Sequence, residues 1–256
     1  MKQRLQKLLA NAGVESRRHV EEMIRQGRVA VNGKIMVDLP ILVDPREDRV
    51  EVDGERIILR QSKDEKIYIL LNKPKDVYST NVAQGEQTRA VDLLPRDLPA
   101  RVYPVGRLDG QTKGLLLLTN DGDLTHRLTH PKFGIPQTYR ATVAGSVSPG
   151  TLNELEKGIW LADPRTGRGV RAASSQMKIV RRTNEMTILE VTLREGRNPQ
   201  LRRALAGAGH KVRDLVRVRM GPLTLHGLAS GESRLLTYQE VRELRKRTSD
   251  KKGKED

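Results

Sequence analysis

The feature that most constrains the fold is a run of four leucines, Leu115–Leu118, which ends at an Asn-Asp-Gly turn. A short apolar run bounded by turn residues is typical of a buried strand. Asp109 lies just before this strand, in a turn that runs from Gly106 to Gly114 and also contains Arg107. Two interpretations follow. Rigid flanks hold the carboxylate for chemistry, or the carboxylate bonds its own backbone, as turn aspartates commonly do.

The chain from residue 66 onward combines short predicted strands with isolated predicted helices. Strands are predicted at 66–74, 102–105, 115–119, 138–143, 176–180, 187–193 and 213–219, and helices at 123–128, 149–157 and 198–208. Regular alternation of strands and helices is missing from this order. The pattern therefore favours the α+β class over a doubly wound parallel sheet.

The N-terminal segment predicts two short helices followed by two hairpins. Leucines at helical spacing predict a first helix that ends at Gly13, and Ser16 is placed to cap a second helix that ends at Gly27. Asn32-Gly33 and Asp53-Gly54 then predict hairpins with tight primed turns.

The chain is strongly basic, and the charge is clustered. It carries 47 Lys and Arg against 32 Asp and Glu, a net charge of +15. Residues 1–34 hold eight basic and three acidic side chains, and residues 194–219 hold eight and two. Such clusters favour a polyanionic partner, since phosphate contacts release counterions. Only one Phe, one Trp and five Tyr are present, which argues against a broad aromatic platform for stacking bases.

The sequence offers no pattern for a disulfide, a membrane span or a metal site. There is no cysteine, which excludes disulfides and thiolate metal sites and suits a cytoplasmic location. No apolar run reaches membrane length, so no membrane partner is predicted. His126 and His130 stand at i and i+4, but Pro131 ends that helix and no third ligand follows. We therefore predict no metal.

The stretch Arg107-Leu108-Asp109, with the downstream Gly-Leu-Leu-Leu-Leu-Thr-Asn-Asp-Gly run, resembles the catalytic motif of the RsuA/RluB branch of RNA pseudouridine synthases. The resemblance implies a catalytic domain with a largely antiparallel, mixed central sheet flanked by helices. It also implies that Asp109 is the essential carboxylate in the isomerisation of uridine to pseudouridine. This reaction requires no cofactor.

Two further stretches match the same family. Tyr139, in Gln137-Thr138-Tyr139-Arg140, resembles the active-site tyrosine that stacks on the target base; a strand tyrosine is otherwise commonly a packing residue. Arg197, in the Glu195-Gly196-Arg197 motif, matches the basic residue that pairs with the catalytic aspartate. Gln137 and Pro199 depart from the family pattern, in which charged residues are usual. These departures leave details of RNA contact open.

The N-terminal segment resembles an S4 (αL-type) RNA-binding domain, through residues 4–9, 12–13, 16–18 and 27–34. The alternative is a small helical cap with solvated arginines. The residues expected to contact RNA are Arg4, Lys7, Arg17, Arg18, Arg28 and Lys34 in this domain, and Arg107, Arg202, Arg203, Arg217 and Arg219 in the catalytic domain. Arg202 and Arg203 are also compatible with a solvated charge pair.

The predicted organisation is an S4-like domain at 1–60, a linker at 61–66, the catalytic domain at 67–240 and a charged, disordered tail at 241–256. The expected partner is ribosomal RNA or a pre-ribosomal particle, bound by a monomer. The resemblance is nearest to the enzymes that modify 23S rRNA, with 16S rRNA as the alternative. A non-catalytic ribosome-assembly factor and a DNA-binding regulator also remain open.

Overall fold

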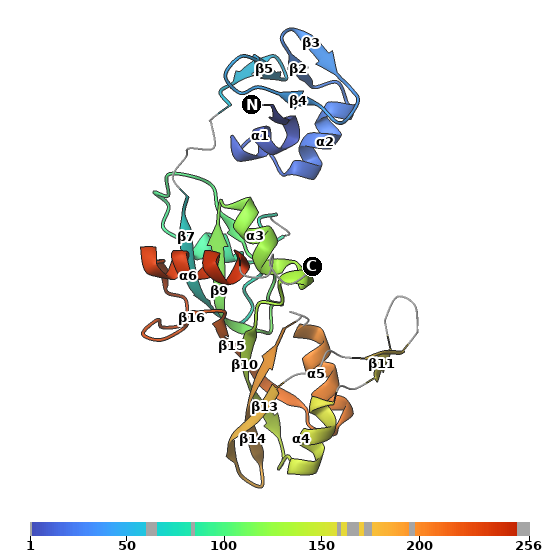
Figure 1. The fold of residues 1–256 in the computed structure, drawn as a ribbon, viewed down its shortest axis with the longest axis vertical. Helices are drawn as coiled ribbons and strands as arrows, with labels where there is room; N and C mark the ends of the chain where they lie inside the picture. Colours follow the sequence, from blue (N-terminus) through green and yellow to red (C-terminus); the bar gives the residue numbers. More distant parts are fainter. Residues whose placement is uncertain are drawn as a thin grey trace. The chain divides into compact units, whose positions relative to one another are not determined.

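The structure is a computed structural model that describes residues 2–59, 66–82, 85–157, 160–162, 169–171, 176–194 and 198–249. The chain divides into two compact units (Figure 1). Unit 1 comprises Met1–Lys66 with Pro99–Arg101, and unit 2 comprises Ile67–Leu98 with Val102–Asp256. Within the described ranges, none of the helices has the length and apolar character needed to cross a lipid bilayer.

Unit 1 packs two helices against small sheets. Its elements are β1 (Gln3–Arg4), α1 (Leu5–Asn11), α2 (Arg17–Arg25), β2 (Val29–Val31), β3 (Lys34–Met36), β4 (Leu42–Val43), β5 (Val50–Val52) and β6 (Glu55–Ile57). Four strands form a sheet in the order β3-β2-β5-β6, and β1 pairs with β4. The core joins leucines of α1, Ile24 of α2 and valines of the strands.

Local sequence signals explain why unit 1 folds in this way. The Ser16 hydroxyl accepts a hydrogen bond from the His19 amide at 3.2 Å and caps α2. Asn32 and Gly33 have φ values of 52° and 80°, as a primed two-residue turn requires. The predicted helices and hairpins of this unit are confirmed.

Unit 2 is built on one mixed sheet. The strands of the unit are β7 (Tyr68–Lys73), β8 (Tyr103–Pro104), β9 (Lys113–Thr119), β10 (Gln137–Ala144), β11 (Trp160–Ala162), β12 (Gly169–Arg171), β13 (Gln176–Arg182), β14 (Met186–Leu193), β15 (Val212–Met220), β16 (Leu223–Thr224) and β17 (Ser233–Leu235). Of these, β11 and β12 pair only with each other, in a separate two-stranded sheet. The helices of the unit are η1 (Ala90–Leu93), α3 (Gly122–Thr129), η2 (Pro131–Phe133), α4 (Pro149–Glu156), α5 (Asn198–Gly207) and α6 (Tyr238–Ser249).

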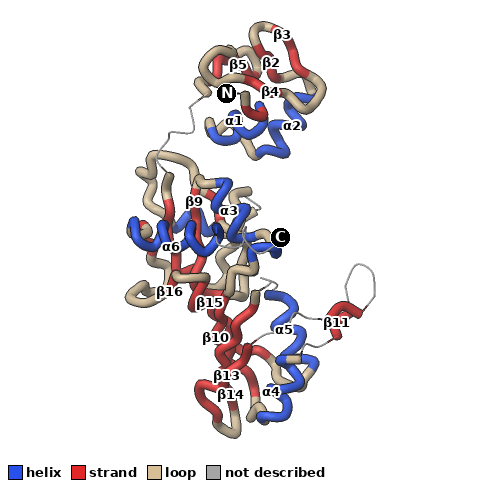
Figure 2. The backbone as a smooth tube through the Cα atoms, viewed as in Figure 1, coloured by secondary structure: helices blue, strands red, loops and turns tan. Residues whose placement is uncertain are grey.

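The sheet has the order β13-β14-β10-β15-β9-β7-β17, with β8 beside β9 and β16 beside β15. Its pairings are antiparallel except for the parallel contact of β15 with β9. Helices α3 and α6 lie beside β7 and β9, while α4 and α5 lie beside the β10, β13 and β14 region (Figure 2). The α+β class and the largely antiparallel mixed sheet are confirmed.

The leucine run forms the centre of this sheet. Leu115, Leu116, Leu117 and Leu118 of β9 are all 0% exposed, so the run is buried on both faces. Gly114 enables the parallel contact with β15. A Cβ atom there would lie 2.8 Å from Val216 Cγ1 and closer still to the Arg217 carbonyl oxygen. A side chain at this position would therefore force the two strands apart.

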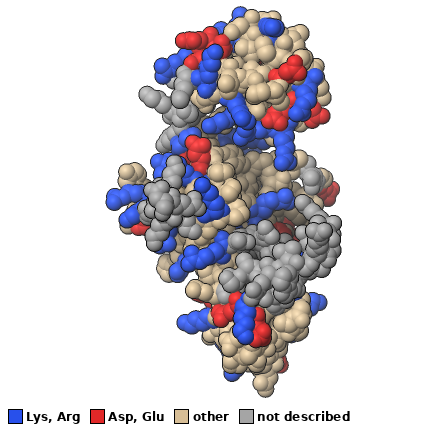
Figure 3. Space-filling view, turned by 45° about the vertical axis from the view of Figure 1, so that its right-hand side comes forward, with Lys and Arg blue, Asp and Glu red and all other residues tan. Residues whose placement is uncertain are grey.

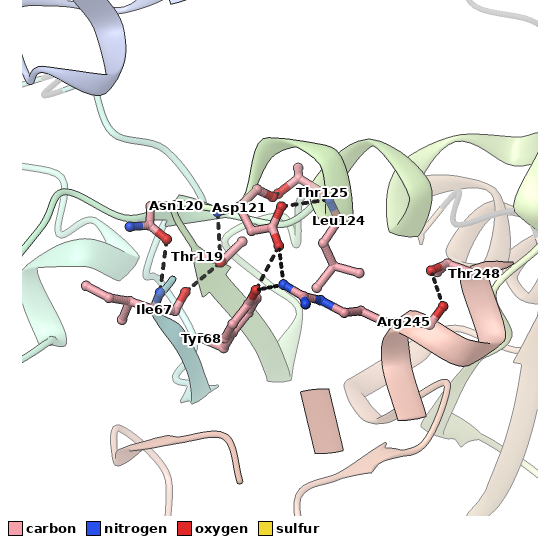
Figure 4. Close-up of polar contacts among 9 residues, drawn as sticks. All are labelled: Ile67, Tyr68, Thr119, Asn120, Asp121, Leu124, Thr125, Arg245 and Thr248. Atoms are coloured by element: carbon pink, nitrogen blue, oxygen red, sulfur yellow. Dashed lines mark hydrogen bonds and ion pairs between the residues drawn. The ribbon is translucent and has the colours of Figure 1, made fainter. Parts of the chain in front are cut away.

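A polar network of buried Tyr68 and Asp121 with exposed Arg245 joins β7, α3 and α6 (Figure 4). The Tyr68 hydroxyl donates to Asp121 Oδ2 at 2.7 Å, and Arg245 Nη2 donates to that hydroxyl at 2.7 Å and to Asp121 Oδ2 at 3.2 Å. Asp121 Oδ1 also caps α3 by accepting from the Leu124 amide. Burial and the nearby Asp121 carboxylate raise the pKa of Tyr68 to about 12. The network fixes the start of α3 against the sheet.

The predicted disorder of the C-terminal tail is wrong over positions 241–249, because α6 extends to Ser249. Leu244 is 0% exposed in the core, and Arg245 belongs to the network above. A capping box starts the helix: the Glu240 amide donates to Thr237 Oγ1, and the Thr237 amide donates to Glu240 Oε2. That Thr-x-x-Glu signal was readable in the sequence. Residues 250–256 of the predicted tail, and 60–65 around the predicted linker, lie outside the described residues.

Glu240 provides a test of this helix through acid stability. Two hydrogen bonds from Arg234, at 2.7 and 2.9 Å, lower the pKa of Glu240 to about 2 from 4.5. The stabilisation is therefore complete above the unfolded-state pKa and is lost as pH falls toward 2. We expect Glu240→Gln to lower the free energy of unfolding at pH 7 by about 2 kcal/mol, as measured by urea denaturation.

The difference between wild type and Glu240→Gln should shrink steadily as the pH is lowered through this window. Glu243→Gln is the control, since Glu243 is exposed on the same helix and receives only a 3.5 Å contact from Gln239. A difference that stays constant down to the lowest pH would contradict the assignment of the ion pair.

Candidate active site

Asp109 lies in a loop whose backbone is fixed on several sides. Ser79 Oγ accepts from the Leu108 amide at 3.1 Å and donates to the Leu108 carbonyl at 3.0 Å. The Asp76 amide donates to the Gly110 carbonyl at 2.7 Å, and the Thr112 amide to the Asp109 carbonyl at 3.1 Å. Leu108 is buried while Asp109 itself is exposed. The loop therefore presents a carboxylate to solvent from a rigid support.

Tyr78 borders this loop. A Cβ atom on Gly110 would lie 3.2 Å from Tyr78 Cε1, so the ring lies directly against the backbone beside Asp109. Tyr78 is 36% exposed. The sequence analysis did not single out this residue, and no local pattern marks it.

Lys73 is a second residue near the loop that the sequence analysis missed. Its side chain is 0% exposed at the end of β7, and Nζ donates to the carbonyls of Pro74 and Val77 at 2.8 and 2.7 Å. Burial lowers the pKa of Lys73 to about 8, although the negative charges of Asp109 and Asp76 act to raise it. Lys73 therefore lies within electrostatic reach of Asp109. Its sequence context, a lysine before the proline that ends a strand, gives only a weak signal.

Tyr139 and Gln137 form a shared hydrogen-bond cluster with Arg217. Tyr139 on β10 is 0% exposed, and its hydroxyl donates to Gln137 Oε1 at 2.8 Å. Arg217 Nη1 donates to the same oxygen at 2.9 Å, and Arg217 Nε donates to the Leu115 carbonyl at 2.7 Å. Arg217 Nη2 is buried and has no hydrogen-bond partner among the described residues. The departure at position 137 thus has a structural role, since the glutamine links the tyrosine to a buried cation.

The expectation that Arg217 contacts RNA from an exposed basic face is wrong, because its side chain is only 2% exposed. Arg217 alternates regularly with Leu215, so both side chains lie on the buried face that carries Tyr139, and a break in the register of β15 then turns Arg219 to the other face. Tyr139 pairs with Arg217 and Thr138 pairs with Arg219, so Val218 bulges out and the two arginines face opposite sides of the sheet. The strict alternation assumed from the sequence does not survive a bulge. Arg219 is exposed, as expected.

A groove of about 320 Å³ lies on the other face of the sheet from Tyr139. Thr138 and Arg140, the strand neighbours of Tyr139, line it together with Glu190 and Arg219. Successive residues of a strand point to opposite faces. The groove is therefore separate from the face of the sheet that carries Tyr139.

Arg202 on α5 reaches the Asp109 loop. Its Nη2 donates to the Gln111 carbonyl at 2.9 Å, and its buried Nε has no hydrogen-bond partner among the described residues. Arg202 is thus half-buried against the loop, not a purely outward phosphate contact, whereas Arg203 and Arg107 are exposed. Arg197 lies outside the described residues, so its pairing with Asp109 stays a prediction.

The predicted RNA-contacting residues of unit 1 lie mostly at the surface. Arg4, Arg17, Arg18 and Lys34 are exposed, and Lys7 is half-buried. Arg28 is exposed but makes two hydrogen bonds to the Asp53 carboxylate, at 2.6 and 2.8 Å, so its charge is already compensated. Lysine and arginine predominate over acidic side chains on the face drawn in Figure 3. This surface suits a polyanion.

The chemical capacity of the site follows from these groups. A fixed, exposed carboxylate lies near a buried lysine and one half-buried arginine, and a tyrosine is oriented by a glutamine and a buried arginine. Together, these groups can stabilise a charged or covalent intermediate and transfer a proton. Within the described ranges, no three His, Asp or Glu side chains gather in a way that could hold a metal.

Comparison with known proteins agrees with this geometry. Residues 67–207 match the family described as RNA pseudouridylate synthase, and residues 3–37 match the S4 domain. "Ribosomal large subunit pseudouridine synthase B" of Bacillus subtilis (strain 168) is 42% identical over 95% of this chain and 96% of its own length. An "Uncharacterized RNA pseudouridine synthase" of Aquifex aeolicus (strain VF5) is 41% identical over 95% and 94%.

A solved structure described as "Crystal structure of pseudouridylate synthase" superposes with a TM-score of 0.66 at 29% identity, over 94% of this chain and 99% of that one. The family match covers more than half of the chain, and the relatives cover nearly all of it. The chain therefore belongs to the RNA pseudouridine synthase family, and it carries an S4 domain ahead of its catalytic unit.

Proposed function

We propose that this enzyme isomerises one uridine of 23S ribosomal RNA to pseudouridine, with Asp109 as its essential carboxylate and as a monomer. The observation that carries the choice of RNA is the 42% identity, over nearly the full length of both chains, to the Bacillus subtilis protein named for the large ribosomal subunit. The fixed, exposed position of Asp109 supports its role.

The reaction breaks the N1–C1′ glycosidic bond, turns the uracil and forms a C5–C1′ bond. C5 loses a proton and N1 gains one, so the atoms balance without a cofactor. The target must first leave its stack, at a cost of roughly a few kcal/mol. Exposed Arg107, two residues before Asp109, is placed to hold the flipped nucleotide. Asp109 then acts on the ribose or the base while the enclosing site retains the detached uracil.

A cation near Asp109 opposes protonation of its carboxylate in a site that excludes water. Arg197 is one candidate for this role. Arg202 is the other, because its guanidinium already bonds the carbonyl of Gln111, two residues beyond Asp109. Comparing Arg197→Lys with Arg202→Lys would show which arginine carries the role.

Tyr139 is proposed to act through a hydroxyl group that Gln137 orients. Its proton is committed to Gln137 Oε1, and an amide oxygen that accepts a hydrogen bond from Arg217 cannot take that proton up. Gln137 and Arg217 therefore position Tyr139 and do not relay a proton themselves.

Replacing the proposed carboxylate gives the primary test. We expect Asp109→Asn to fold normally, bind RNA and lose at least about 10³-fold in rate, which is ~4 kcal/mol of transition-state stabilisation. Pseudouridine would be mapped by carbodiimide-adduct primer extension on unmodified 23S and 16S rRNA fragments. Asp97→Asn, at an exposed position outside the loop, is the matched control.

Each outcome of that experiment has a clear meaning. One stop on the 23S fragment that disappears with Asp109→Asn supports the proposal. A stop on the 16S fragment moves the target to the small subunit. Turnover by the Asn variant removes Asp109 from the chemistry, and tight binding with no stop on either RNA favours the assembly-factor alternative.

The hydrogen bonds that join Tyr139, Gln137 and Arg217 predict that substitutions of Tyr139 and Gln137 have coupled effects on kcat. Gln137→Leu removes the shared acceptor, so we expect kcat to fall about 10- to 100-fold, with a smaller fall for Gln137→Glu, which keeps an acceptor. Because Gln137 acts through the Tyr139 hydroxyl, Gln137→Leu should have little further effect in a Tyr139→Phe background. Additive losses in this double-mutant cycle, measured by single-turnover kinetics, would show that the two residues act independently.

The basic surface of unit 1 predicts a salt-dependent contribution to binding. We expect Arg17→Gln with Arg18→Gln to weaken RNA binding and to reduce the slope of log K against log salt by about 1.4 to 1.8, which corresponds to two lost phosphate contacts. The saturating rate should change little. Arg46→Gln, at another exposed position of unit 1, is the control. An unchanged slope would place the RNA elsewhere on this unit.

A further inference from the structure

Three rings gather at the end of α3, outside the groups that the proposed chemistry uses. The imidazoles of His126 and His130 have centroids 5.1 Å apart, and the Phe133 ring lies 6.2 Å from each of them in edge-on contact. We call these three residues the ring cluster. Both histidines are exposed, while Phe133 is half-buried and packs against the core. Phe133 thus anchors the cluster, and the imidazoles present their surfaces to solvent.

The ring cluster is fixed in place. Leu124 and Leu128 bury the inner side of α3, and Asp121 caps its first turn within the network that includes Tyr68 (Figure 4). The Lys132 amide donates to His130 Nδ1 at 3.2 Å, which places the proton of the neutral imidazole on Nε2. The outer nitrogen of His130 is therefore a hydrogen-bond donor.

Cationic side chains flank the ring cluster. Arg127 and Lys132 are exposed, and Lys132 Nζ lies 5.8 Å from the centre of the Phe133 ring. Asp123, one turn earlier on α3, is the nearest acidic residue in the sequence. An exposed ring can stack on the planar base of an unpaired nucleotide, and a neighbouring cation can donate hydrogen bonds to its phosphate. The ring cluster and its flanking cations therefore suit such a nucleotide.

The ring cluster lies beside the loop that holds Asp109. A Cβ atom on Gly106 would be 3.6 Å from Thr129 Cγ2, and Thr129 stands between the two histidines in sequence. Two residues, Arg107 and Leu108, separate Gly106 from Asp109, a span of at most about 11 Å of chain. An RNA strand with one uridine at Asp109 can therefore bring an adjacent nucleotide to the cluster.

We propose that His126, His130 and the flanking Arg127 and Lys132 bind an unpaired nucleotide next to the target uridine, with its base stacked on an imidazole and its phosphate held by the cations. The proposal rests on Asp109 being the reaction centre. A metal is a poorer occupant, because no third metal-ligating side chain accompanies the two histidines in the described part of the chain. An RNA ligand also matches the substrate class of the family.

The test uses the full chain and a 23S rRNA fragment. The double variant His126→Ala with His130→Ala should raise KM and the RNA dissociation constant about 5- to 150-fold, the range for loss of one base stack, with kcat within about twofold. His126→Phe with His130→Phe keeps the stacking surfaces and should recover most of the affinity. Tyr238→Ala is the control, since Tyr238 is 84% exposed on α6.

A direct readout separates binding from general structural damage. The fluorescent base 2-aminopurine would replace the nucleotide on either side of the target uridine, and binding would be followed with Asp109→Asn protein so that the RNA stays unreacted. Stacking should quench the fluorescence at one of the two positions, and the double Ala variant should abolish the quenching. Arg127→Gln with Lys132→Gln should keep the quenching but lower the salt slope by about 1.4 to 1.8.

Unchanged KM, dissociation constant and quenching in the double Ala variant would overturn the proposal. Failure of the proposed function gives a different pattern. The proposed function fails if the modified uridine lies in 16S rRNA or if Asp109→Asn retains turnover. In either case, the affinity of the double Ala variant is compared with that of the wild type on the RNA that the wild-type protein binds, with 2-aminopurine beside the uridine that the wild type modifies. A ratio near one on that RNA still rejects the ring cluster as a binding site.

Discussion

The close parallel approach of β15 to β9 at Gly114 is the constraint on which the rest of the site depends. Since a Cβ atom at this position would collide with Val216 and Arg217, glycine sets the spacing of the two strands. That spacing lets Arg217 Nε reach the Leu115 carbonyl. The guanidinium then holds Gln137, which in turn holds the Tyr139 hydroxyl. Asp109 enters the same strand from the preceding loop, so one backbone contact organises both proposed chemical groups.

Buried cations characterise the environment of the Asp109 loop. Lys73 and Arg217 are almost completely buried, and the Arg202 guanidinium is held against the Gln111 carbonyl. Burying a cation is unfavourable unless other groups compensate it. Backbone carbonyls compensate part of this charge for all three residues, and an anionic substrate would supply more. The Asp109 loop thus carries positive charge around it, as the proposed function requires of a site that binds RNA.

Much of this arrangement was predictable from local sequence patterns. The leucine run, the caps and primed turns of unit 1, and most strands of unit 2 follow from periodicity and turn chemistry, because these signals act over a few residues. The turn before the leucine run singled out Asp109 as a candidate, but the family resemblance alone assigned roles to Asp109 and Tyr139, since an aspartate in a turn or a tyrosine in a strand has ordinary structural uses. Their roles in the reaction remain predictions.

What the sequence could not provide was long-range geometry. Strand pairing decides that Arg217 lies on a buried face and that the bulge turns Arg219 away from it. Lys73 adjoins the Asp109 loop only because β7 ends there, and Arg202 contacts Gln111 across 91 positions. Helix α6 is different, since its capping box was readable but its high charge favoured a disordered tail. There, the buried Leu244 and the hydrogen bonds of Arg245 to Tyr68 and Asp121 outweigh the polar character of the segment.

The bulge at Val218 has a consequence for how this site can diverge. A substitution in β15 changes one side chain, but the loss of one residue there would restore regular alternation and exchange the faces of everything beyond it. Arg217 and Arg219 could then not both keep their present surroundings. The number of residues in β15 is therefore more tightly constrained than their identities. Relatives should differ in β15 by substitutions and not by insertions or deletions.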